Sequence, residues 1–272
     1  SLKIKSKVVA VAGGAIQTPV LLLKSNIPNK SGLIGKTLHL HPYCPVGAFF
    51  DKEILGWRGI PQSMYCDDFA DFKKGGYGGF IMIPGFAHPG SMAGITPGYG
   101  KAHWEIMKEY TKMAAGGAMA HDETNGTVSV NRYGNPEIKY WPDKSDQQII
   151  IAGFKKVSEI YLAAGAKKVL LPFTTPTYAK STKDLQGLEN ITLKPRKITI
   201  MSVHPQGTCR MGEDPLTSVV NSQCESHDIK GLFICDTSVY PTSLGTPPQV
   251  PTMALGVMVA EKIVKDKVRL LT

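Results

Sequence analysis

The chain has 272 residues, of which 42% are hydrophobic and 19% charged, so it can bury a sizeable core in one or two globular domains. The 31 Lys and Arg and the 22 Asp and Glu give the chain a formal net charge of +9. The lysines form no basic stripe interleaved with aromatic residues, so nucleic-acid binding is not expected. A basic surface suits an acidic partner subunit or an anionic substrate equally well, and no apolar run approaches the ~20 residues of a membrane span.

A nucleotide-binding style of element is predicted at the start of the chain. Residues 7–12 read as a short apolar strand, and residues 12–14 as a turn. A helix is expected from about Thr18 to Lys24, with Thr18 as its N-cap and Pro19 in its first turn.

The pattern changes over residues 41–194, where short alternating or aromatic-rich segments are separated by Gly and Pro. These segments predict an antiparallel sheet. They comprise residues 43–50, 79–83, 115–121, 126–131 and 137–140. Residues 131–136 read as a hairpin loop. A helix is expected over residues 144–164, capped by Asp143 or Ser145 and ended by a left-handed Gly165.

The middle region is also rich in Met and aromatic residues, among them Met92, Trp104 and Tyr110. Such residues suit either an apolar pocket or plain core packing. The Gly- and Pro-rich residues 84–100 are a candidate mobile loop over a site, which is a hypothesis from composition.

The cysteines and histidines do not predict a metal centre. Five cysteines without a CxxC pair fit neither a zinc site nor a disulfide framework, and they favour a reducing, cytoplasmic compartment. His39 and His41 form a His-x-His pair, but no third ligand lies near in sequence, so loop packing is the expected role.

The most informative motifs lie near the C-terminus. His204 opens the loop HPQGTCRMG, and residues 232–241 read LFICDTSVYP, an apolar strand that ends on Asp236. A polar loop followed by a buried strand, turns and an apolar helix is how separated segments assemble a cofactor site. On spacing alone, a core histidine beside an ordinary strand explains the pattern as well.

These motifs resemble the C-terminal signature of the glucose-methanol-choline (GMC) family of FAD-dependent oxidoreductases. The closest branch holds cholesterol oxidase, long-chain alcohol oxidases and sugar or sugar-acid dehydrogenases. The stretch VVAVAGGAIQTPVLLLKSNI is similar to the family's internal Gly-Ala-x-x-Thr-Pro signature, although residues 25–28 read Ser-Asn-Ile-Pro where the family usually has Ser-Gly-x-Gly. The resemblance implies an α+β fold, FAD as cofactor and oxidation of an alcohol.

The family's N-terminal GxGxxG turn is missing from this chain. The glycine cluster at residues 75–79 has the wrong spacing and follows no apolar strand. The chain therefore reads as the C-terminal portion of such an enzyme. Residues 1–40 and 195–272 would complete the FAD domain, residues 41–194 would form a substrate domain with a mainly antiparallel sheet backed by helices, and the N-terminal half would come from elsewhere.

The resemblance also implies roles for single residues. His204 matches the catalytic base, which takes the hydroxyl proton as hydride leaves the carbon. The implied cofactor contacts are Ala12, Gly13, Gly14, Asp236, Thr237, Pro248, Gln249 and Val250. The last helix is expected to start near Thr252, with its positive end toward the flavin.

One position departs from the family pattern. Pro247 stands where many relatives carry Asn, and proline has no side-chain donor. In the family, this residue is the second polar group of the site, beside the catalytic histidine. Thr246 or Gln249 could supply its hydrogen bond, His204 could act without it, or the activity could be lost. The alternative function is a non-catalytic structural or binding remnant without FAD, and the substrate stays open between a sterol, a long-chain alcohol and a sugar.

Overall fold

The computed structural model describes residues 2–58, 60, 62–70 and 79–271. The chain forms two compact units, each built from separated segments. The first contains residues 1–40, 123–141 and 203–272, and the second contains residues 41–122 and 142–202.

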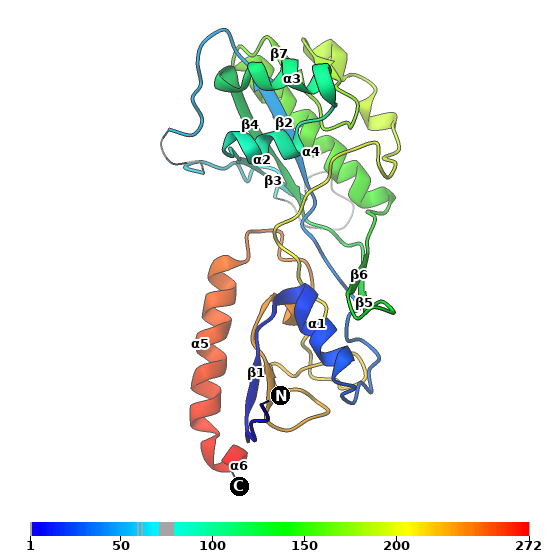
Figure 1. Cartoon of the computed structure of the whole chain (residues 1–272), viewed down its shortest axis with the longest axis vertical. Helices are drawn as coiled ribbons and strands as arrows, with labels where there is room; N and C mark the ends of the chain where they lie inside the picture. Colours follow the sequence, from blue (N-terminus) through cyan, green and yellow to red (C-terminus); the bar gives the residue numbers. More distant parts are fainter. Residues whose placement is uncertain (1, 59, 61, 71–78, 272) are drawn as a thin grey trace. The chain divides into compact units, whose positions relative to one another are not determined.

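A two-stranded parallel sheet lies at the centre of the first unit. Strand β1 (Val9–Val11) pairs with β9 (Leu232–Ile234), so that Val9 faces Leu232 and Val11 faces Ile234. Helix α1 (Gly14–Lys24) follows β1 after a short turn, and Figure 1 shows it alongside the strand. The short helix η4 (Thr237–Val239) follows β9, and α5 (Gln249–Lys265) and α6 (Lys267–Leu271) end the chain.

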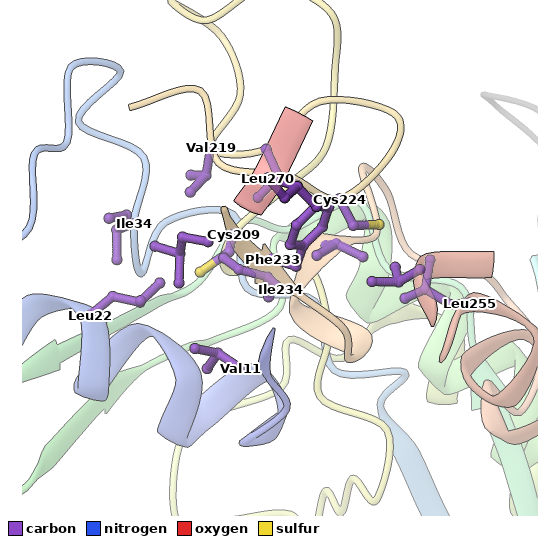
Figure 2. Packing of buried hydrophobic residues seen from close by; sticks show 14 residues of the cluster. Val11, Leu22, Ile34, Cys209, Val219, Cys224, Phe233, Ile234, Leu255 and Leu270 are labelled. Atoms are coloured by element: carbon purple, nitrogen blue, oxygen red, sulfur yellow. The ribbon is translucent and has the colours of Figure 1, made fainter. Parts of the chain in front are cut away.

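The core of this unit collects apolar side chains from all of these elements. Phe233 and Ile234 are fully buried, and Figure 2 shows them among Val11, Leu22 and Leu255. Burying such side chains contributes about 1.5–3 kcal/mol each. The core therefore fixes the ends of β1, β9 and α1 against one another.

A β-hairpin also belongs to the first unit. It consists of β5 (Thr127–Val130) and β6 (Pro136–Lys139), joined by the predicted loop. Val128 packs against Val20 of α1 and against Leu38. The compact units therefore differ from the division into residues 1–40, 41–194 and 195–272, because the apolar side of this hairpin is buried against α1.

The second unit contains a five-stranded antiparallel sheet of order β3-β4-β2-β7-β8. Three of the predicted strand segments, residues 43–50, 79–83 and 115–121, lie in this sheet, whereas residues 126–131 and 137–140 form the hairpin of the first unit. The strands of the sheet are β2 (Tyr43–Phe49), β3 (Phe80–Pro84), β4 (Met113–Ala120), β7 (Lys168–Leu170) and β8 (Tyr178–Ala179). Helix α4 (Lys144–Ala163) covers one face, where Gly153 approaches Ala118 so closely that an added Cβ would lie 2.5 Å from the Ala118 Cβ.

Helices α2 (Pro89–Ile95), α3 (Gly100–Lys108) and η1 (Tyr110–Lys112) pack against the other face. Met113 lies in their cluster, and it points away from Ala118 because side chains alternate along β4. Two further short helices, η2 (Thr182–Leu185) and η3 (Leu188–Asn190), follow the sheet. The prediction of a loop over residues 84–100 was wrong, because Pro89 opens a helix whose Met92 is buried.

The predicted helix over residues 144–164 is confirmed. Asp143 caps it by accepting the backbone N–H of Asp146, and Gly165 is left-handed with φ +92°. The glycine cluster at residues 75–79 falls outside the described residues except for Gly79.

Two predicted helix starts were wrong. Helix α1 begins at Gly14, four residues before Thr18, and Thr18 does not cap it. Helix α5 begins at Gln249 rather than near Thr252. Thr252 lies within the first turn of the helix, and its hydroxyl donates to the Pro248 carbonyl at 2.6 Å.

Candidate active site

The carboxyl ends of β1 and β9 bring the two predicted cofactor segments together. After Val11 and Ile234, which are paired, the chain continues into Ala12-Gly13-Gly14 and into Cys235-Asp236-Thr237. The backbone N–H of Gly14 donates to Asp236 Oδ2 at 2.9 Å. Ala12 and Gly13 are exposed to solvent, and the Gly13 N–H donates to the Thr18 hydroxyl at 3.0 Å. Ligands of parallel sheets bind at this edge of the strands.

The Asp236 carboxylate is buried and fully engaged within this turn. It is 5% exposed, and both oxygens accept hydrogen bonds. Besides Gly14, the Thr18 hydroxyl donates to Oδ2 at 2.6 Å, and the backbone N–H of Ser238 donates to Oδ1 at 2.8 Å. Asp236 thus binds the first N–H of α1, which explains why the helix begins before Thr18. Its side chain orders the turn.

Pro19 sits inside α1 and leaves a helix carbonyl without its usual partner. Proline has no N–H, so the carbonyl of Ala15, four residues earlier, cannot be satisfied within the helix. The Thr208 hydroxyl donates to that carbonyl at 2.7 Å. This hydrogen bond replaces the one that is missing within the helix, and it connects α1 to the loop that contains His204.

Gln206 organises the loop that contains His204. It is fully buried, and its backbone exchanges two hydrogen bonds with His39. Its Nε2 donates to the His204 carbonyl at 3.2 Å, and its Oε1 accepts the backbone N–H of Leu244 at 3.1 Å. The loop before α5 and the His204 loop are therefore joined through one side chain.

Thr237 joins the same loop to the end of β9. Its hydroxyl donates to the Pro205 carbonyl at 2.8 Å, and its own carbonyl accepts the backbone N–H of Gly207 at 3.0 Å. Gly207 has φ +88°, and a Cβ there would lie 2.5 Å from the Thr37 carbonyl oxygen. Only glycine fits this position without strain.

The environment of His204 favours a neutral imidazole. The residue is half-buried, and this desolvation lowers the pKa of its side chain below the ordinary value. A neutral imidazole can accept a proton, which is what a general base requires.

The start of α5 supplies the remaining predicted residues. Thr246, Pro247, Gln249 and Val250 are exposed, and Pro248 is buried. Thr252, whose hydroxyl donates to Pro248, also bonds the Tyr240 hydroxyl at 3.1 Å. The helix start is therefore anchored to the segment after β9, while the side chains of Thr246 and Gln249 face solvent.

Sequence reasoning missed three residues that assemble this site. Thr18, Gln206 and Thr208 are fully buried polar residues whose side chains connect the segments. For Thr18, the sequence feature that could have indicated a tertiary role is its position directly before a Pro inside an apolar helix. For Gln206 and Thr208, the feature is that they are polar residues within the motif around His204.

The five cysteines and the histidine pair form no metal centre in the part of the chain that the structure describes, since no group of three or more His, Cys, Asp or Glu lies close enough to hold an ion. All five cysteines are free thiols. His39 and His41 are both buried in the loop before β2. No described helix is long and apolar enough to span a membrane.

These features define a class of protein. The chain is a two-unit α+β protein in which the turns after β1 and β9 lie at the edge of a parallel sheet where ligands bind, and the other unit contains an antiparallel sheet. Comparison with known proteins narrows this class. Models of the GMC oxidoreductase family match residues 1–43 and 122–256. The chain belongs to the GMC oxidoreductase family.

Relatives and solved structures agree with this assignment. The chain is 27% identical to an uncharacterized GMC-type oxidoreductase of Mycobacterium tuberculosis, over 97% of this chain and 41% of that protein. It is 27% identical to a long-chain-alcohol oxidase of Arabidopsis thaliana, over 96% of this chain and 37% of that protein. A structure of Aspergillus oryzae formate oxidase, studied for FAD modification, has the same fold with a TM-score of 0.68 at 16% identity, covering 97% of this chain and 55% of its own.

The chain spans about two fifths of the length of these curated relatives. Family membership indicates FAD as the cofactor, and the geometry of the first unit fits it. Ala12 and Gly13 lie exposed at the carboxyl end of β1, the edge of a parallel sheet at which ligands bind.

Proposed function

We propose that this chain is the part of an FAD-dependent alcohol oxidoreductase that carries the catalytic base. The observation behind the proposal is the network that joins His204, through Gln206 and Thr237, to the turns at the ends of β1 and β9. In this proposal the first unit contributes to the FAD site and the second unit to the substrate site. Bound FAD supplies the acceptor for the hydride that leaves the alcohol carbon.

His204 accepts the hydroxyl proton of the substrate in this mechanism. Because burial lowers its pKa, the imidazole is neutral at neutral pH and ready to take that proton. Gln206 holds the backbone of His204, so the ring is presented from a fixed loop. Positioning of this kind is required for efficient proton transfer.

The second polar group of the site is proposed to come from the start of α5. Pro247 cannot donate a hydrogen bond, whereas the exposed Thr246 and Gln249 flank it and can. The backbone at Pro248, Gln249 and Val250 lies at the positive end of α5, which would stabilise negative charge on reduced flavin. A primary or secondary alcohol is the proposed substrate class, and the similarity to long-chain-alcohol oxidases makes long-chain alcohols the first to test.

The test is a visible absorption spectrum of the chain purified together with a polypeptide that carries the family's GxGxxG segment. We expect a bound flavin band that bleaches when a long-chain primary alcohol, a sterol or a sugar is added without oxygen. His204→Ala is expected to keep the band and lose the bleaching, while the exposed-histidine control His88→Ala keeps both. Absence of any flavin band would contradict the proposal and favour a remnant without a redox role.

A further inference from the structure

The backbone of the His204 loop is held by hydrogen bonds along its whole length. Each of the five consecutive carbonyls from His204 to Thr208 accepts one. The Gln206 side chain and the Thr237 hydroxyl supply two of the five donors. The other three donors come from one short segment, residues 35–39, which lies far away in sequence. This segment is therefore a main support of the loop.

Thr37 interrupts the regular pairing between this segment and the loop. His39 and Gln206 exchange two backbone hydrogen bonds, both at 3.0 Å, as an antiparallel pair does. In a regular ladder, the next pair of this kind would be Thr37 with Thr208. Instead, Thr37 donates its side-chain hydroxyl to the Gly207 carbonyl at 2.8 Å. At this position a side chain, and not the backbone, supports the loop.

The backbone of Thr37 is strained. Its φ is +54°, in the left-handed region, where a β-branched side chain crowds the backbone. Gly207, which faces it, is also left-handed, and the Thr37 carbonyl oxygen would lie 2.5 Å from a Cβ at that position. Strain of this kind persists only where the surrounding structure imposes it, and it concentrates at functional sites.

The start of the β5–β6 hairpin holds the segment from its other side. Leu38 is fully buried and exchanges two backbone hydrogen bonds with Gly126, at 3.0 and 2.8 Å. The Val128 N–H donates to the Gly35 carbonyl at 2.7 Å. Because the chain is fixed on both sides of Thr37, the left-handed conformation is imposed on this residue and its hydroxyl is directed at the loop.

We propose that Thr37 is a positioning residue for the base: its hydroxyl, directed by the left-handed backbone, fixes the Gly207 carbonyl and thereby the loop that contains His204. The inference rests on the proposed function, in which His204 accepts the hydroxyl proton of the substrate. A base must lie within hydrogen-bond reach of the proton that it accepts. A displacement of about 1 Å between reacting groups can lower a rate about 100-fold.

Three substitutions at Thr37 separate the role of its hydroxyl from that of the fold. Thr37→Val keeps the shape of the side chain and removes the donor. Thr37→Gly also removes the donor but relieves the left-handed backbone, so it preserves the fold even if Thr37→Val does not. Thr37→Ser keeps the donor and is the conservative rescue. Thr174→Val is the matched control, because the exposed Thr174 hydroxyl donates to the Arg196 carbonyl at 3.0 Å, outside the first unit.

The first measurement is amide hydrogen exchange of the chain without FAD, followed by NMR. We expect Thr37→Val and Thr37→Gly to speed exchange about tenfold at the Gln206 and Gly207 amides and to leave the buried Ile234 amide of β9 unchanged. Thr37→Ser and Thr174→Val should match the parent. Unchanged exchange at both loop amides would overturn the inference, and so would an equal rise at Ile234, because the hydroxyl would then act on the whole unit.

The second measurement is the reduction of bound flavin by an alcohol, without oxygen, in the flavin-loaded complex. Both Thr37→Val and Thr37→Gly should lower the limiting rate at least about tenfold. The alcohol concentration that gives half of this rate should stay the same, because positioning acts on the chemical step rather than on binding. A folded Thr37→Gly that reduces flavin at the parent rate would overturn the inference.

The two measurements separate this inference from the proposed function. A parent complex that binds no flavin contradicts the proposed function, and hydrogen exchange still decides whether Thr37 holds the loop. A parent complex that is bleached by an alcohol supports the proposed function, whatever the Thr37 variants do.

Discussion

Replacing Asp236 by alanine should destabilise the first unit strongly. Its carboxylate accepts from the backbone N–H groups of Gly14 and Ser238 and from the Thr18 hydroxyl, at 2.9, 2.8 and 2.6 Å. A buried donor that loses its partner costs about 1–3 kcal/mol. Water can reach the part-buried Gly14 N–H, so we expect Asp236→Ala to lower the free energy of unfolding by about 3–5 kcal/mol.

The assay is urea unfolding of the chain, followed by circular dichroism. Asp214→Ala is the control, since this exposed aspartate accepts the Leu216 N–H on the surface and should cost under about 1 kcal/mol. Thr18→Ser should stay near the parent because it keeps the hydroxyl, and Thr18→Val should lose about 2 kcal/mol. If Asp236→Ala is no more destabilising than Asp214→Ala, the carboxylate does not hold α1 as described.

Three further outcomes are expected. Gly207→Ala should lower the free energy of unfolding by more than about 1 kcal/mol, because φ is +88° and the Thr37 carbonyl lies 2.5 Å from the new Cβ; an unchanged urea midpoint would contradict this. In the flavin-loaded complex, kcat/KM should rise with pH and reach half its plateau below about pH 6.5, because burial lowers the pKa of His204 and only the neutral form is a base; a half-point above 7 would refute it. Burial raises the pKa of Cys209 and Cys224 to about 12, so a thiol reagent at pH 8 should modify neither in the native chain and both in urea, and fast native labelling would count against it.

Local patterns were enough to predict most elements of this chain. The alternation along β2, where every second residue is buried, and the 3.6-residue period of α4 are patterns that the sequence displays directly. The cap at Asp143 and the left-handed Gly165 follow from backbone chemistry within a few residues.

The start of α1 could not be predicted in the same way. The group that satisfies the Gly14 N–H is Asp236, 222 residues further along the chain, and the group that satisfies the Ala15 carbonyl is the Thr208 hydroxyl. Local rules therefore placed the cap at Thr18, next to Pro19. The assignment of the β5–β6 hairpin to the first unit likewise depends on Val128 packing against Val20, a contact that no local pattern reveals.

The motif around His204 pointed to the site, but its supports became visible only in three dimensions. The sequence indicated His204 and Asp236 as separate candidates. The structure adds that Gln206 binds the loop before α5 and that Thr237 binds the His204 loop. Both are tertiary contacts between polar side chains and backbone, which periodicity and composition do not report.

The most direct test of the central claim is the rate of flavin reduction by an alcohol in the reconstituted complex, measured by rapid mixing without oxygen. General-base catalysis contributes about 10²–10⁴-fold, so His204→Ala should reduce flavin at least about 100-fold more slowly than the parent while binding the same amount of FAD. Equal rates in His204→Ala and the parent would contradict the assignment of His204 as the base.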